Sequence, residues 1–127
     1  MKLEYFKDAC EGRGLLLLYG GSPADLECLR AAVRKLMIAG TTVQLHKLQF
    51  VETVSNCGLT AGSIPRGGGV RRLSPSTFCW ELSPSEWKLV DGLLEPFCSA
   101  AAETGVRFQY LNHHPGIEVI YSTRREW

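Results

Sequence analysis

Apolar residues along the chain follow two kinds of spacing, one typical of strands and one typical of helices. Residues 15–19 form a short, continuous apolar run between glycines, which predicts a strand buried on both faces of a sheet. Alternating positions predict further strands at 3–5, 42–48, 58–64, 70–73, 78–82, 106–110 and 117–121, with the middle ones forming an antiparallel meander. Apolar stripes at three- and four-residue spacing predict helices after Ser22 and Ser83.

Both predicted helices begin in the same way. Ser-Pro-x-Asp starts at Ser22, and Ser-Pro-x-Glu starts at Ser83. The serine can cap free N–H groups, the proline fits the first helical position, and the acid favours the positive helix end. Pro96 removes a backbone hydrogen bond, which predicts that the second helix kinks or ends near Glu95.

Residues 15–48 and 78–111 share one order: strand, capped helix, glycine, strand. This likeness does not prove a duplication, because good helix starts converge on the same residues for physical reasons. Connections of this type are right-handed when they return to their own sheet, which places both helices on one face. The predicted fold is therefore one α+β domain over 1–127: a single mixed or antiparallel sheet with two helices on one face, ferredoxin-like with extra strands.

Composition and the length of the apolar runs limit the kinds of partner and the cellular location to be expected. A net charge of +1 does not favour a polyanion binder, so we expect no nucleic-acid partner. The apolar runs are far shorter than the ~20 residues that span a bilayer, so we expect no membrane partner. The five cysteines are odd in number and form no C-x-x-C pair, which favours free thiols and a cytoplasmic location.

With both helices on one face, the other face of the sheet is predicted to be open. Its polar positions are expected to be Gln44, His46, Glu81, Arg107, Gln109 and Glu118. Phe108 and Tyr110 share the phase of the aliphatic residues, which predicts that they lie under the helices and argues against an RNA-binding sheet. The open face or an edge strand could pair with a second copy, so a homodimer is expected.

Segment 66–72 reads Arg-Gly-Gly-Gly-Val-Arg-Arg and is the candidate ligand- or anion-binding loop. Glycine N–H groups can approach an anion, and arginines can bind phosphate in a bidentate manner. The candidate residues are Arg66, Gly67, Gly68, Arg71 and Arg72. The segment lacks the Gly-Lys-Ser/Thr ending of a P-loop and precedes no helix, so a hairpin tip with solvated charges is the alternative.

Catalytic and metal chemistry has little support in the sequence. His113 and His114 are adjacent on a predicted turn, where their side chains diverge, so we predict no metal site and no cofactor. Cys57 could be a nucleophile only with a partnering motif that the sequence does not show, so no catalytic residue is assigned.

The expected function is a non-catalytic binding or assembly module of a bacterial-type cytoplasmic protein that forms a homodimer. Two alternatives stay open. One is a small-molecule or anion binder, or a small enzyme, that uses loop 66–72. The other is a partner-specific inhibitor of the immunity type.

Overall fold

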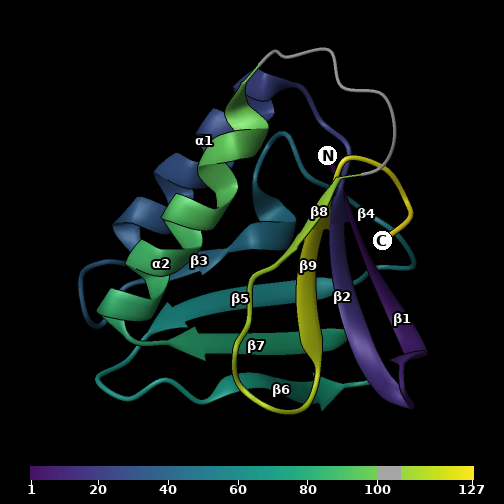
Figure 1. The fold of residues 1–127 in the computed structure, drawn as a ribbon. Helices are drawn as coiled ribbons and strands as arrows, with labels where there is room; N and C mark the ends of the chain where they lie inside the picture. Colours follow the sequence, from purple (N-terminus) through teal and green to yellow (C-terminus); the bar gives the residue numbers. More distant parts are fainter. Residues whose placement is uncertain (100–106) are drawn as a thin grey trace.

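Two β-sheets and two helices make up the computed structural model, which describes residues 1–99 and 107–127 (Figure 1). The parts of the predictions that fall at 100–106 lie outside the described residues. Sheet A contains, in spatial order, β4 (Glu52–Thr53), β1 (Lys2–Cys10), β2 (Arg13–Tyr19), β9 (Glu118–Ser122) and β8 (Phe108–Tyr110). Sheet B contains, in spatial order, β3 (Thr42–Gln44), β5 (Gly58–Ser63), β7 (Thr77–Leu82) and β6 (Gly69–Ser74). The predicted α+β class is confirmed.

The single sheet expected from the sequence is replaced by two sheets. Each predicted strand–helix–strand unit starts in one sheet and ends in the other: β2 belongs to sheet A and β3 to sheet B, while β7 belongs to sheet B and β8 to sheet A. The ferredoxin-like prediction assumed that each helix returns the chain to the sheet it left. Here the helices connect the two sheets instead, because β3 pairs with β5 and β8 pairs with β9.

The order of strands in sheet B also differs from the predicted meander. β7 lies between β5 and β6, and it is parallel to β5 and antiparallel to β6. The connection from β5 to β6 therefore skips one strand position, which β7 fills later in the chain. A local alternation of apolar residues cannot reveal such an order, because every strand in the stretch has the same two-residue period.

Both helices begin as predicted. α1 (Pro23–Lys35) is preceded by Ser22, whose Oγ accepts the N–H of Asp25 at 3.2 Å. α2 (Pro84–Leu94) is preceded by Ser83, whose Oγ accepts the N–H of Glu86 at 3.3 Å. α2 ends just before Pro96, and the 3₁₀ turn η2 (Glu95–Cys98) follows it, as the missing proline N–H requires.

One hydrophobic core joins the helices to both sheets. Leu16 and Leu18 of β2 face the helices, as do Ala61 of β5 and Trp80 of β7. Trp87 of α2 is fully buried, lies edge-on to Trp80 at 4.7 Å between ring centroids, and donates its indole N–H to the Gly62 carbonyl at 3.0 Å. This side chain fixes α2 against sheet B.

The face of sheet A turned away from the helices is also packed. Leu15, Leu17 and Ile120 are fully buried there and contact Phe6, Ala9 and Tyr19. Residues 123–127 fold back towards this face: the Trp127 and Phe6 rings lie 5.2 Å apart, and Arg125 binds Glu4 through two hydrogen bonds of 2.7 and 2.9 Å. The predicted central, doubly buried strand at 15–19 is thus confirmed.

Candidate functional site

β8 forms one edge of sheet A. Leu111 donates its N–H to the Val119 carbonyl at 2.8 Å, and the N–H of Thr123 donates to the Arg107 carbonyl at 2.9 Å. Along an antiparallel edge strand, the backbone N–H and C=O groups of one residue bond the neighbouring strand, and those of the next residue point away from it. Positions 107, 109 and 111 therefore bond towards β9, and the N–H and C=O groups of Phe108 and Tyr110 point outward. Among the described residues, no strand lies on this side of β8.

The side chains of Phe108 and Tyr110 are exposed on the face of sheet A away from the helices. Phe108 is 46% exposed and Tyr110 is 41% exposed, and their ring centroids lie 6.1 Å apart. This placement corrects the expectation that both rings lie under the helices. The strand phase is the reverse of the prediction: Gln109 pairs with Tyr121, whose ring belongs to the main core, so Gln109 is on the helix side.

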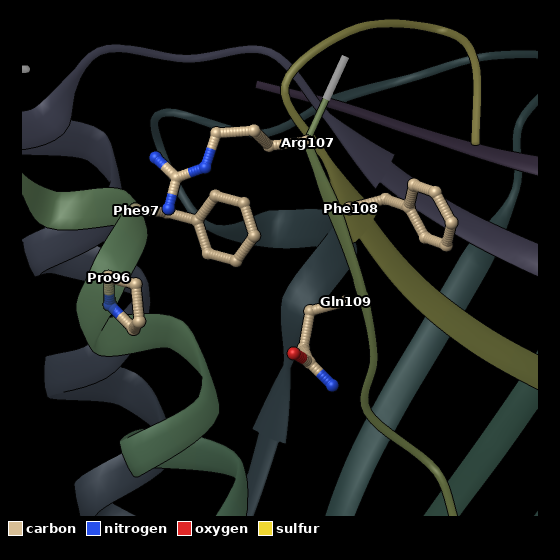
Figure 2. A pocket seen from close by; sticks show the side chains of 5 residues that line it. All are labelled: Pro96, Phe97, Arg107, Phe108 and Gln109. Carbon is tan, nitrogen blue, oxygen red and sulfur yellow. The ribbon is translucent and has the colours of Figure 1, made fainter. Parts of the chain in front are cut away.

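A hollow of about 400 Å³ lies on that helix side, between η2 and β8. Its lining residues are Pro96, Phe97, Arg107, Phe108 and Gln109. Figure 2 shows Arg107 reaching towards Phe97 and Gln109 pointing into the space between helix and strand, while the Phe108 ring points to the other side of β8. The Arg107 guanidinium lies 4.9 Å from the centre of the Phe97 ring, which packs in turn on Tyr121. The edge of β8 thus separates two unlike surfaces, an aromatic one and a mixed, concave one.

The glycine loop and the histidine turn, two separate candidates in the sequence, meet at the start of α2. Glu86 Oε2 lies 2.6 Å from His114 Nε2, and Glu86 Oε1 accepts the N–H of Ser83 at 3.0 Å. A Cβ on Gly67 would overlap Glu86 Oε1, and a Cβ on Gly69 would come within 2.7 Å of the Cβ of His114. The loop backbone therefore packs directly on the Glu86–His114 pair, which explains two of its glycines without a ligand.

The carboxyl of Glu86 is the acidic group of this cluster. Burial raises the pKa of Glu86, but the hydrogen bonds from Ser83 and His114 together lower it by more. The net effect holds the pKa of this carboxyl below its ordinary value, so Glu86 stays ionised at neutral pH. The imidazole of His114 is thereby held in place on the start of α2.

The arginines of loop 66–72 do not converge on its glycines. Arg71 binds Glu81 at 2.9 Å on the outer face of sheet B. Arg72 points to the other face of β6, donates to the Ser74 and Pro75 carbonyls at 3.2 and 2.7 Å, and lies over the ring of Tyr5. Arg66 is exposed. An anion at Gly67 and Gly68 would therefore meet neither Arg71 nor Arg72 in this arrangement.

The polar residues expected on one open face are distributed over several places. Gln44 and Glu81 lie on the outer face of sheet B, and Glu118 lies on the outer face of sheet A, 3.5 Å from Arg13. His46 belongs to the 3₁₀ turn η1 (Leu45–Lys47), where its Nδ1 accepts the N–H of Leu59 at 3.0 Å. Arg107 and Gln109 line the hollow on the helix side. Two features cause this separation: the strands belong to two sheets, and the phase of β8 is the reverse of the one expected.

Cys57 is poorly suited to nucleophilic chemistry. It is 3% exposed, and burial raises the pKa of its thiol to about 11. At neutral pH this thiol is therefore protonated, and the thiolate that nucleophilic attack requires is disfavoured. Within the described part of the chain, no three His, Cys, Asp or Glu side chains are grouped so that they could hold a metal ion.

Comparison with known proteins gives no relative from which a role could be transferred: no family model, curated protein or solved structure matches the chain. Over residues 1–99 and 107–127, no helix has the length and apolar character needed to cross a bilayer.

Sequence reasoning missed β8 as a site because it assigned its two aromatic residues to the core. The signal available was the pattern Arg-Phe-Gln-Tyr at 107–110, a strand with an aromatic face and a polar face. That pattern fixes two opposite faces, but it does not say which one the helices cover.

Proposed function

We propose that this protein is a binding and assembly module that accepts an extended polypeptide strand at the free edge of β8. The observation that carries the proposal is the outward direction of the Phe108 and Tyr110 backbone groups beside their exposed rings. A strand added here gains backbone hydrogen bonds, and its alternating side chains meet the aromatic surface on one face and the hollow at Gln109 on the other.

The two rings are expected to supply a large share of the binding free energy. Both residues are a little under half exposed. Since fully burying a large apolar side chain is worth up to about 3 kcal/mol, covering the exposed parts of both is worth about 2 kcal/mol before ordering costs. Each edge hydrogen bond adds about 1 kcal/mol net. Because the described strand is short, loss of either contribution should reduce affinity strongly.

β6, one of the two edge strands of sheet B, offers a useful contrast. β6 carries Arg71 and Arg72, and Arg72 donates to carbonyls at the end of its own strand. Charged side chains on an edge strand oppose pairing with another chain. β8 itself contains no charged residue and no proline, so it lacks this protection.

The other two functions allowed by the sequence receive different support. A partner-specific inhibitor of the immunity type is compatible with strand addition at β8, since the same edge would bind the target. A small-molecule or anion binder at loop 66–72 receives less, because Arg71 and Arg72 are engaged elsewhere and point to opposite faces of β6.

Selection of short random peptides displayed on a surface tests the proposal and requires no identified partner. We expect enriched peptides with alternating apolar residues that bind the Phe108→Lys/Tyr110→Lys variant at least tenfold more weakly than the unaltered chain. Leu73→Lys is the matched control, because Leu73 is 58% exposed on the edge strand β6. Peptides that bind the double variant and the unaltered chain equally well would contradict the proposal.

A further inference from the structure

The strand β8 is complementary to itself. Its sequence, Phe108-Gln109-Tyr110, has an aromatic residue on each side of a central amide. If two such strands run antiparallel about a two-fold axis at Gln109, each Phe108 lies opposite Tyr110 of the second copy. We infer that the strand accepted at this edge is β8 of a second copy of the chain in this register. The inference rests on the proposed function.

The backbone groups match in that register. The outward N–H and C=O of Phe108 face those of Tyr110 in the second copy, and the axis repeats this pair. The Tyr110 carbonyl also accepts a hydrogen bond of 3.0 Å from the side-chain amide of Gln109 in the same chain. Because a carbonyl oxygen has two lone pairs, it can accept a hydrogen bond from the second copy as well. The two five-stranded sheets A then join into one continuous sheet.

The side chains match as well. Aromatic residues directly opposite each other stabilise antiparallel pairs, and this register forms two Phe–Tyr pairs on the face away from the helices. On the helix side the two Gln109 amides face each other beside the hollow, where they can exchange hydrogen bonds. Arg107 lies opposite Leu111 of the second copy, so no like charges are brought face to face.

Sedimentation velocity measures whether the second copy binds. From dilute solution up to about 1 mM, the weight-average mass should rise from the 14.1 kDa of one chain towards twice that value. Phe108→Lys/Tyr110→Lys should remain a monomer over the whole range, and Leu73→Lys should associate like the unaltered chain. A mass of one chain at every concentration would overturn the inference.

Cysteine cross-linking tests the register. In a Cys28→Ser background, which removes an exposed native thiol, Gln109→Cys places two thiols across the axis. Such a non-hydrogen-bonded pair has Cα atoms about 4.5 Å apart, within disulfide range. We expect Gln109→Cys to form the covalent dimer at least tenfold faster than Tyr110→Cys, whose thiol faces Phe108, or Leu73→Cys.

The outcomes separate the inference from the proposed function. Faster cross-linking of Tyr110→Cys than of Gln109→Cys would overturn the register. A monomeric chain that still binds selected peptides through Phe108 and Tyr110 would overturn the second copy as partner and leave strand addition standing. A chain that stays monomeric and also binds no selected peptide through Phe108 and Tyr110 would overturn strand addition itself.

Discussion

Gly67 and its neighbours show how one residue type can suggest a ligand and serve packing instead. In the sequence, three glycines next to arginines resemble an anion-binding loop. In the structure, Gly67 and Gly69 bring the backbone against Glu86 and His114, and Gly69 has a φ of +80°, which disfavours a side chain. The glycines therefore join the start of α2 to the turn that connects β8 to β9.

Substitution of Gly67 tests this packing role. Gly67→Ala should lower the free energy of unfolding by about 2 kcal/mol, because the new Cβ displaces Glu86 from Ser83 and His114. Gly68→Ala is the matched control: no atom lies within 4 Å of its Cβ position, so its effect should stay within about 0.5 kcal/mol. Denaturant unfolding of the two variants provides the measurement, and equal effects would argue against the packing role.

Lowering the pH should weaken the contacts of Glu86 with Ser83 and His114. The pKa of Glu86 is lower in the folded chain than its ordinary value of 4.5, so its stabilisation is complete above that value and is lost as the pH falls through the folded pKa. The pKa of Glu4 is also lowered, chiefly by Arg125. We expect unfolding free energies between about pH 5 and pH 2 to fall less steeply for Glu86→Gln than for the unaltered chain. Glu4→Gln should remove a separate part of the slope; a slope unchanged in Glu86→Gln would refute the assignment.

Strands and helices were predictable where the local pattern has one meaning. The buried run at 15–19, the Ser-Pro-x-acid helix starts and the stop before Pro96 all follow from short-range sterics and hydrogen bonding. The arrangement of strands was not predictable, because pairing of β2 with β9 and of β5 with β7 joins positions far apart in the chain. For the same reason the sequence did not indicate which face of β8 the helices cover.

Residues 123–127 have the polar sequence of a tail, yet they act as a packing element on sheet A. Trp127 contacts Phe6, and Arg125 lies 4.9 Å over the same ring. Trp127→Ala should therefore lower the free energy of unfolding by about 2 kcal/mol, since the cover of Phe6 is lost. Arg124→Ala is the control, because Arg124 is exposed and bonds Ser122 through its backbone N–H, which the substitution keeps. Thermal unfolding of both variants checks the prediction; an unchanged midpoint for Trp127→Ala would exclude a packing role.

Contacts with both sheets hold the elements that surround the edge strand β8. Phe97 belongs to η2 and packs on Tyr121 of β9. The turn that directly follows α2, which Trp87 fixes on sheet B, thus forms one wall of the hollow beside β8. Arg30 of α1 binds Asp91 of α2 at 2.9 Å and ties the two helices together. A strand added at β8 would thus meet a surface whose supporting residues are packed against both sheets, and such preorganisation reduces the entropy lost on binding.

Amide hydrogen exchange at β8 distinguishes an edge that accepts a strand from one that remains solvated. We predict that the N–H groups of Phe108 and Tyr110 exchange fast in dilute solution and at least tenfold more slowly at high chain concentration or with a saturating selected peptide. The N–H groups of Gln109 and Leu111, which bond β9, should be protected in every condition. Exchange at Phe108 and Tyr110 that is equally fast in all conditions would contradict strand addition at this edge.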